Sequence, residues 1–375
     1  MPSQKELKIE MVRLGEKLVD LDADLLRLVA RRQEISVRMG EIKQNMGERN
    51  RDFQQEKDVL ERARELGCEL LLPEALCDQL FSLLIKDSLA TQERQAIAVQ
   101  GEGDGRRVLV IGGAGKMGRW FARFLDSQGF EIEISDPIDG MDGYKNIGRW
   151  EETDLDHDVI VVAAQIREST KILEGLLHCR PSGLVIDISS LKSPMRRPLQ
   201  ALVEEGIKVS SIHPMFGPDT ELLSGRHVIF IDLGVEEAHQ AARSLFASTT
   251  AELVDMDLEE HDRLIAYVLG LSHALNIAFV AALAKSGEDA PRLAQLSSTT
   301  FDAQLRVASQ VAHDNPHLYF EIQSLNDYGS ESLSALQKVV SQLKSIVESG
   351  DERGFVDLMR ESLQYLKSRL REGAD

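Results

Sequence analysis

Three glycines in the middle of the chain have the spacing of a turn that binds a ligand carrying phosphate. Gly113, Gly115 and Gly118 form the pattern G-x-G-x-x-G between a short apolar run and a stretch with helical periodicity. Glycines in a strand-turn-helix order let the backbone approach the pyrophosphate of a dinucleotide. A second apolar run ends in Asp136, whose carboxylate can accept from both ribose hydroxyls and repel a 2′-phosphate. The pattern predicts an NAD site formed by Gly113, Ala114, Gly115, Lys116, Met117, Gly118 and Asp136.

Polar residues also follow two later apolar runs of the same region. His213 comes directly after one run and begins the string His-Pro-Met-Phe-Gly-Pro, and Ser190 follows the run before it. Ligands of an open α/β sheet bind at the carboxyl ends of its strands, so both side chains are candidates for chemistry beside NAD. A neutral His213 can take a proton from a substrate hydroxyl while hydride leaves for NAD, and Ser190 can bind that hydroxyl or orient the ring. The structural alternatives are a histidine and a serine that cap local structure.

The N-terminal region carries a third group of polar residues. Arg32 and Lys43 lie eleven residues apart, which is three helical turns, so their two cations share one helix face. Further polar candidates lie four residues apart on the next two helical stretches, at Asp52, Glu56, Ser88 and Gln92. Side chains four apart on a helix are neighbours, so three helices can direct polar groups into one bundle. Composition alone favours the alternative that these are ordinary charged positions on a helix surface.

Apolar periodicity predicts the elements that position the third group. Apolar residues three and four apart over 5–43, and again over 52–66 and 73–94, predict three helices. The polar, glycine-rich run Gln100–Gly105 predicts a flexible linker. We therefore expect an all-α domain at 1–95 and a linker at 96–106.

Beyond the linker, β-rich apolar runs alternate with helical stretches, and this alternation predicts a parallel, doubly wound sheet. The expected strands are 108–111, 132–135, 159–163, 184–188, 209–212 and 228–231. Helices follow to the end of the chain, and the spacing of Leu336, Val340, Leu343 and Val347 predicts a helix packed on another helix, with a role in a homodimer. We expect a Rossmann-like α/β NAD-binding domain at 107–257 and an all-α dimerisation and substrate domain at 258–375.

Bulk composition excludes several classes of function. The chain has 375 residues, with 43 basic and 62 acidic residues and a formal net charge of −19. Such a charge repels nucleic acid and anionic membranes. Three cysteines, without the spacing of a metal site, favour a reducing compartment. We see no signal peptide and no uninterrupted apolar span of about 18 residues, so we expect a cytoplasmic protein without metal or membrane segment.

Several strings of residues resemble a known family. They are Gly112-Gly-Ala-Gly-Lys-Met-Gly118, Asp187-Ile-Ser-Ser-Leu-Lys192, His213-Pro-Met-Phe-Gly-Pro218, Glu260-His-Asp262, Leu271-Ser-His273 and Asn315-Pro-His-Leu-Tyr319. The resemblance is to the prephenate dehydrogenases, and within them to the bifunctional chorismate mutase/prephenate dehydrogenases. It implies oxidative decarboxylation of prephenate to 4-hydroxyphenylpyruvate in tyrosine biosynthesis. It also implies that His213 is the catalytic histidine, Ser190 the serine beside it, and His273 a histidine on the substrate side.

The N-terminal region resembles the all-helical chorismate mutase fold, an intertwined dimer. The resemblance implies a pericyclic rearrangement of chorismate to prephenate, catalysed by holding a dianion in its compact conformer. In these terms Arg32 binds a carboxylate, and Lys43 and Gln92 face the ether oxygen. The resemblance places Asp52, Glu56 and Ser88 around the rest of the site.

Three positions depart from the family pattern. Gly15 and Gln55 stand where the mutase family has arginines, and Gln310 stands where the dehydrogenase family has an arginine that binds a substrate carboxylate. Arg306, one helical turn before Gln310, is a candidate replacement. One alternative is therefore a monofunctional prephenate or arogenate dehydrogenase with an inactive mutase domain. Another is a non-enzymatic NAD-binding sensor. Family behaviour also implies feedback inhibition by tyrosine.

Overall fold

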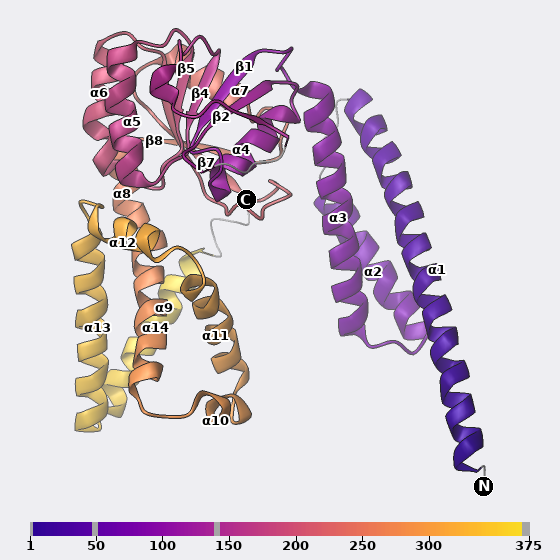
Figure 1. Ribbon diagram of the computed structural model, residues 1–375. Coiled ribbons are helices and arrows are strands. Elements are labelled where there is room, and N and C mark those ends of the chain that lie inside the picture. The colour runs from indigo at the N-terminus through magenta and orange to yellow at the C-terminus, as the bar shows by residue number, and fades with distance from the viewer. Residues whose placement is uncertain (1–2, 47–51, 139–142, 370–375) are drawn as a thin grey trace. The chain divides into compact units, whose positions relative to one another are not determined.

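The computed structural model describes residues 3–46, 52–138 and 143–369 (Figure 1). The chain divides into two compact units. The first comprises 1–164, 171–189 and 198–256, and the second comprises 165–170, 190–197 and 257–375.

The first unit begins with three helices, α1 (Gln4–Asn45), α2 (Phe53–Glu69) and α3 (Glu74–Gln100). The C-terminal part of α1 packs against α3, and Figure 1 shows the N-terminal part of α1 running on beyond α2 and α3. On that part, Leu14, Leu18 and Leu21 are 53%, 61% and 57% exposed. The apolar stripe that predicted this helix therefore has no partner within the described chain.

An eight-stranded sheet follows, in the order β3-β2-β1-β4-β5-β6-β7-β8. Its strands are β1 (Arg107–Ile111), β2 (Glu131–Ser135), β3 (Lys145–Asn146), β4 (Val159–Val162), β5 (Leu184–Asp187), β6 (Val209–Pro214), β7 (His227–Ile231) and β8 (Glu252–Met256). All neighbours are parallel except β6 and β7, which are antiparallel. The expectation of a wholly parallel sheet was wrong, and the short or half-exposed strands β3 and β8 were missed.

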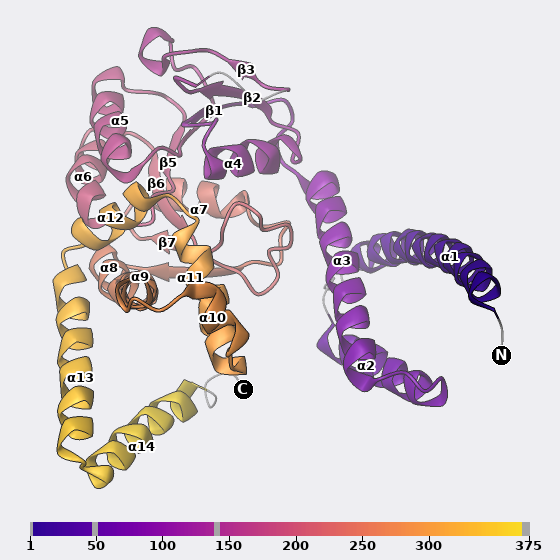
Figure 2. The same ribbon diagram turned by 60° about the horizontal axis from the view of Figure 1, so that its bottom comes forward.

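The crossovers between strands and the reversal at β7 together decide which face of the sheet each helix covers. Helices α4 (Lys116–Asp126) and α7 (Glu236–Ser244) share one apolar core, and α4 packs on β1 and β2 (Figure 2). Right-handed crossovers place α4, which leads from β1 to β2, on the face opposite to α5 (Ile166–Cys179) and α6 (Arg196–Glu204). Because β7 and β8 run the other way, the same handedness puts α7 back on the α4 face.

The glycine-rich run after α3 is not a free linker, which corrects the sequence-based expectation. Helix α3 continues to Gln100, and the N–H groups of Gly103 and Gly105 donate to Gln128 and Gly129 carbonyls at 2.9 and 3.0 Å. A Cβ at Gly103 would lie 2.3 Å from the backbone of Gly129. Glycine is needed here for close packing of two backbones rather than for flexibility.

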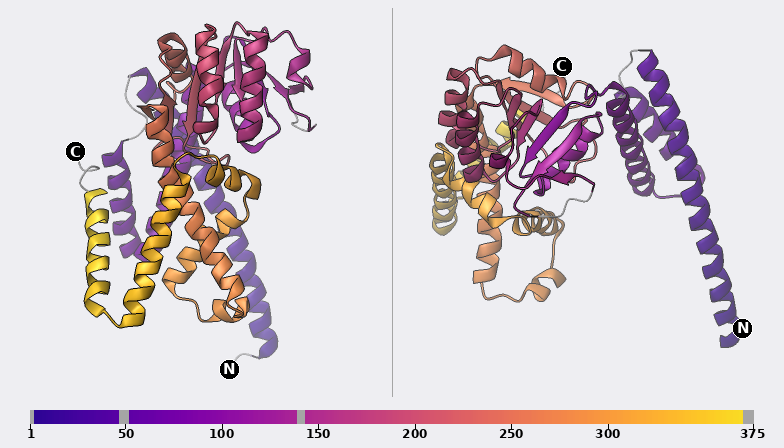
Figure 3. Two further views of the ribbon diagram at one scale, coloured as in Figure 1. Left: turned by 90° about the vertical axis from the view of Figure 1, so that its left-hand side faces the viewer. Right: turned by 45° about the horizontal axis from the view of Figure 1, so that its top comes forward.

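The second unit is helical after residue 257. Its helices are α8 (Leu258–Ile265), a π-helical turn (Ala266–Leu271), α9 (Ser272–Lys285), α10 (Ala290–Gln295), α11 (Thr299–Ala312), α12 (Pro316–Ser324), α13 (Gly329–Ser349) and α14 (Glu352–Arg369). Helices α13 and α14 are joined at Gly350 and diverge from that joint, as Figure 2 shows, and Figure 3 gives two further views of them. The predicted stripe on α13 is largely exposed, with Val340 at 55% and Val347 at 62%.

One helical stretch of this unit is more apolar than the sequence analysis recognised. Residues Leu258–Lys285 are long and apolar enough, by length and composition, to cross a membrane, and 22% of the most apolar window is buried within the chain. Within this stretch, Asn276 is buried and donates to the Ser272 carbonyl. A helix that packs in a protein core or interface passes the same length and composition test.

Candidate active sites

The glycine turn joins β1 to α4 at the point where the strand order reverses, with β2 on one side of β1 and β4 on the other. Gly112 has a φ of +84°, and a Cβ there would lie 2.8 Å from Ala163. The tight turn therefore needs Gly112, which directly precedes the three glycines of the pattern. A Cβ at Gly113 would lie 2.6 Å from the Ile134 side chain, and one at Gly118 would lie 2.1 Å from the Gly112 oxygen.

Asp136 lies beside this turn at the end of β2. Its carboxylate accepts the Ala114 N–H at 3.1 Å and the Ile138 N–H at 2.9 Å. Helix α4 begins at Lys116, so its N-terminal N–H groups and the positive end of its dipole meet the glycine turn. A cradle that any Cβ would fill, a helix N-terminus and a carboxylate at the next strand end fit NAD, with the pyrophosphate at the turn and the ribose at Asp136.

His213 lies in β6 at the carboxyl edge of the same sheet and is 4% exposed. Beneath this edge lies Asp187, a wholly buried carboxylate that the sequence analysis quoted only as part of a motif. It accepts the Ser189 N–H at 3.0 Å and the Ser211 hydroxyl at 2.7 Å. Asp187 thus ties the end of β5 to the strand that carries His213.

In the second unit, a buried carboxylate holds the segment that carries Ser190. Ser190 is half-buried in 190–197, and Asp262 of α8 accepts the Lys192 N–H at 2.9 Å and both the N–H and hydroxyl of Ser193. His261 Nδ1 lies 2.7 Å from the same carboxylate. Burial alone would raise the pKa of Asp262, but hydrogen bonds from His261, Ser193 and Lys192 hold it below the usual value. Only its place in the string Glu260-His-Asp262 marked this residue in the sequence.

His273 lies at the start of α9, with its ring edge-on to Tyr319 at 4.2 Å between centroids. Burial lowers its pKa to about 4, against an opposite effect of the Asp314 carboxylate. Its Nδ1 is buried and has no hydrogen-bond partner among the described residues. The imidazole is therefore neutral near pH 7. Arg306 and Gln310 both lie exposed on α11, and Arg306 forms no ion pair within the described ranges.

We expect His273 to make the stability of the protein fall with acidification. Its folded pKa of about 4 lies below the ordinary 6.5, so the unfolded chain binds more protons between these values and the free energy of unfolding falls as pH drops through them. Urea unfolding of wild type and His273→Gln at several pH values tests this, with exposed His317→Gln as the control. The stability advantage of wild type over His273→Gln must shrink on acidification, and a constant difference contradicts the argument.

The mutase candidates of the N-terminal helices lie largely together. Arg32 donates to the Leu84 carbonyl at 2.8 Å and to the Ser88 hydroxyl, which joins α1 to α3. Burial lowers the pKa of Arg32 and Asp87 opposes the shift, but a guanidinium remains charged at pH 7. Lys43 donates to Gln55 at 2.9 Å. Gln55, which stands where the mutase family has an arginine, therefore belongs to the same group of side chains.

Gln92 shows a contact that the sequence analysis missed. Its Nε2 donates to the Ser36 carbonyl and hydroxyl at 2.9 and 2.8 Å, and its Oε1 is buried without a hydrogen-bond partner in the described structure. A Cβ at Gly40 would lie 2.9 Å from the Gln92 side chain, so Gly40 makes room for it. Asp52 is placed differently: its carboxylate caps α2 by accepting the Gln54 and Gln55 N–H groups, and Glu56 follows in the first turn.

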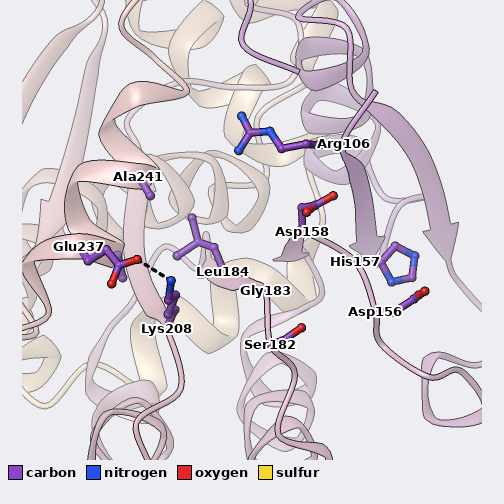
Figure 4. A pocket seen from close by; sticks show the side chains of 11 residues that line it. Arg106, Asp156, His157, Asp158, Ser182, Gly183, Leu184, Lys208, Glu237 and Ala241 are labelled. Carbon is purple, nitrogen blue, oxygen red and sulfur yellow. Dashed lines mark hydrogen bonds and ion pairs between the residues drawn. The ribbon is translucent and has the colours of Figure 1, made fainter. Parts of the chain in front are cut away.

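A separate pocket lies at the amino ends of the strands, opposite to the edge with the glycine turn (Figure 4). Lys208 and Glu237 pair with each other across it, and the Asp158 carboxylate accepts the Arg107 N–H at 2.8 Å. Lys208, Glu237 and Asp158 therefore already have partners within the chain. The pocket offers no reacting group comparable to those at the carboxyl edge.

Three family models match successive parts of the chain. They are chorismate mutase type II at residues 14–93, the prephenate dehydrogenase nucleotide-binding domain at 145–254, and the prephenate dehydrogenase dimerization domain at 257–361. The second match begins after the glycine turn, so the assignment of that turn depends on its geometry.

Similar proteins cover most or nearly all of this chain. A probable arogenate/prephenate dehydrogenase of Methanocaldococcus jannaschii is 27% identical over 71% of this chain and 62% of its own length. The T-protein of Enterobacter agglomerans is 24% identical over 92% of this chain and 90% of its own. The crystal structure of prephenate dehydrogenase from A. aeolicus, in complex with hydroxyphenyl propionate and NAD+, has the same fold, with a TM-score of 0.55 and 18% identity over 70% of this chain and 98% of that chain. Because mutase and dehydrogenase models match one chain and the likeness to a T-protein runs along nearly all of it, this chain belongs to the bifunctional chorismate mutase/prephenate dehydrogenases.

Proposed function

We propose that this chain converts chorismate to prephenate at its N-terminal helices and oxidises prephenate at the carboxyl edge of its sheet. The observation that carries the second step is the position of His213 on the same sheet edge as the glycine turn and Asp136. NAD bound there would supply the acceptor for the hydride that leaves the ring carbinol of prephenate. The chain's own groups hold the dinucleotide through the glycine turn, the start of α4 and Asp136.

His213 acts as the general base of the dehydrogenase. Its buried imidazole takes the proton of the ring hydroxyl as hydride leaves, and Ser190 hydrogen-bonds the same hydroxyl. Loss of carbon dioxide then makes the ring aromatic, which drives the reaction forward. Neutral His273 binds on the substrate side, where its low pKa keeps a nitrogen lone pair available. Arg306 supplies positive charge in place of the arginine that Gln310 replaces.

The mutase step needs no proton transfer, so positioned charge carries it. Arg32, oriented by Leu84 and Ser88, binds a carboxylate of chorismate. Lys43 and Gln92 stabilise the ether oxygen, and Glu56 with Ser88 lines the site. Asp52 contributes by capping α2, which fixes the helix that carries Glu56.

Two spectrophotometric assays test the two activities. NADH formation is followed with prephenate plus NAD, and then with chorismate plus NAD, with arogenate as a third substrate. NADH from both prephenate and chorismate supports the bifunctional proposal. NADH from prephenate alone means an inactive mutase domain, and NAD binding without turnover of any substrate means a sensor. Adding tyrosine to the prephenate assay tests end-product inhibition.

Two copies of the chain form the active assembly in this proposal. The exposed leucines of α1 and the exposed stripe of α13 need an apolar partner, and a homodimer supplies one by symmetry. The match of 257–361 to a dimerization domain supports it. Light scattering coupled to size exclusion should give twice the mass of the 41.8 kDa chain.

We expect Gly15→Arg to raise mutase activity. Gly15 lies exposed on α1, and nothing lies within 4 Å of a Cβ at this position, so the longer side chain fits. Replacing glycine stabilises the helix by about 1 kcal/mol, and the new cation restores a charge that the family supplies. The gain should be about tenfold in mutase kcat/KM.

Gly15→Ala is the matched control, because it adds the helix stability without the charge. An equal gain in both variants would assign the effect to the helix and contradict a role for charge at residue 15.

A further inference from the structure

Helix α3 carries two adjacent polar residues that serve different parts of the first unit. Gln92 faces α1, where it donates to Ser36. Glu93 is 1% exposed, and its Oε2 accepts the Leu223 N–H at 2.7 Å. Its Oε1 accepts the Thr250 N–H at 2.9 Å and the Thr250 hydroxyl at 2.6 Å. One carboxylate of the mutase helix therefore satisfies three donors of the dehydrogenase sheet region.

Both partners of Glu93 lie in segments that lead to or from the strands next to the candidate base. Leu223 belongs to the loop 215–226, which starts directly after β6 and the His213-Pro214 pair. Thr250 lies just before β8, which pairs with β7, and β7 in turn pairs with β6 at His213. The loop is held at a second point by Trp120, whose indole N–H donates to the Thr220 carbonyl at 2.9 Å.

The contact is rigid because α3 is built into the sheet region. Ile97, one turn after Glu93, lies in the same apolar core as α4 and α7. The run after α3 is fixed by the hydrogen bonds of Gly103 and Gly105. A buried carboxylate is costly unless its oxygens are hydrogen-bonded, and charged acceptors form stronger bonds than neutral ones. Here a carboxylate fastens the loop to α3.

We propose that Glu93 is a positioning residue of the dehydrogenase reaction: it holds the loop after His213 in place and makes the geometry of that loop depend on the mutase helix. This proposal rests on the proposed dehydrogenase function of His213. The NAD-binding turn lies at β1, and Glu93 makes no contact with it. Loss of the carboxylate therefore affects the turnover of prephenate and the order of the loop, while NAD binding is retained.

Glu93→Gln tests the proposal, because the amide keeps the shape but replaces one acceptor oxygen by a donor that faces N–H groups. We expect dehydrogenase kcat to fall about tenfold or more, with the KM for NAD and the mutase kcat/KM changed less than about twofold. Hydrogen exchange at 215–226 should become faster by a similar factor. Arg94→Gln, on an exposed neighbour of the same helix, is the matched control and should change none of these values.

Thr250→Val is the second variant, since it removes one donor to Glu93 and leaves the N–H in place. It should lower dehydrogenase kcat in the same direction by a smaller factor. Unchanged kcat in Glu93→Gln overturns the proposal, and so does an equal loss of both activities, which would mean a purely structural role. If the wild type turns over neither prephenate nor arogenate, the dehydrogenase proposal fails. Loop exchange unchanged by Glu93→Gln then rejects the positioning contact separately.

Discussion

His213→Asn should lower dehydrogenase kcat by about a hundredfold to ten-thousandfold, because general base catalysis by a positioned side chain contributes on this order. The asparagine amide retains hydrogen-bonding groups in a site that is 4% exposed, but it cannot take the proton of the substrate hydroxyl. Affinity for NAD should be retained. The glycine turn lies on β1, separated from β6 by β4 and β5 in the sheet order, which is about 14 Å at the usual strand spacing.

The measurement combines steady-state NADH formation with titration of NAD by fluorescence. His227→Asn is the matched control, since this histidine is exposed at the start of β7 and pairs with Glu252. A His213→Asn enzyme with wild-type kcat would remove His213 from the mechanism. A parallel loss of NAD affinity would indicate that His213 supports the cofactor site rather than the proton transfer.

The glycine turn shows what local sequence can predict. Its strand, spacing and terminal carboxylate are consecutive in the chain, so they predicted the βαβ unit and its Asp136. The pattern alone does not predict whether Gly112 or Gly113 adopts the left-handed backbone conformation with positive φ. That choice depends on Ala163, directly after β4, and Ile134 of β2, which approach the turn from other parts of the sheet.

The prediction that β7 runs parallel to its neighbour β6 was wrong for a related reason. The apolar run at 228–231 reads alike in a parallel or an antiparallel strand, and the loop 215–226 contains no helix to signal a crossover. Alternation of apolar and helical stretches predicts strands and helices, but it does not predict which way the chain re-enters the sheet.

Buried carboxylates were the functional residues that sequence reasoning missed most often. Asp262 and Glu93 each accept backbone N–H groups that are distant in the chain, and Asp187 accepts the Ser211 hydroxyl of the neighbouring strand. A charged residue in a helix pattern looks like a surface residue, and periodicity carries no signal for a partner 130 residues away. Glu93 was for this reason passed over beside Gln92, which the resemblance had marked.

The glycine-rich run after α3 was wrongly predicted to be flexible. Glycine and polar residues occur both in free linkers and where two backbones touch, and only the Gln128–Gly129 turn distinguishes the two cases. The correction has a consequence for function. Mutase and sheet regions joined through α3 are one compact unit, so a variant in one region has to be assayed for both reactions.

Arg32→Ala should abolish most mutase activity and leave the dehydrogenase nearly unchanged. Removing one charged group from a site that binds a dianion costs about 2 to 5 kcal/mol, or roughly thirtyfold to several-thousandfold in kcat/KM. Arg32 is held for this role by Leu84 and Ser88 of α3, so its guanidinium needs no reordering when chorismate binds. The assay follows chorismate loss, with prephenate oxidation measured on the same preparation.

Arg31→Ala is the control for Arg32→Ala, because Arg31 is the adjacent, exposed arginine of the same helix and removes the same net charge. If charge only attracts the dianion at long range, both variants should lose mutase activity equally, and the effect should become smaller with added salt. A specific role of Arg32 lowers the mutase activity of Arg32→Ala alone, and this loss persists at high salt. Ser88→Ala separates binding from orientation: it keeps the cation but removes the hydroxyl that Arg32 donates to, so an orienting role predicts an intermediate loss of mutase kcat. Equal activity of Arg32→Ala and wild type would place chorismate elsewhere on the helices.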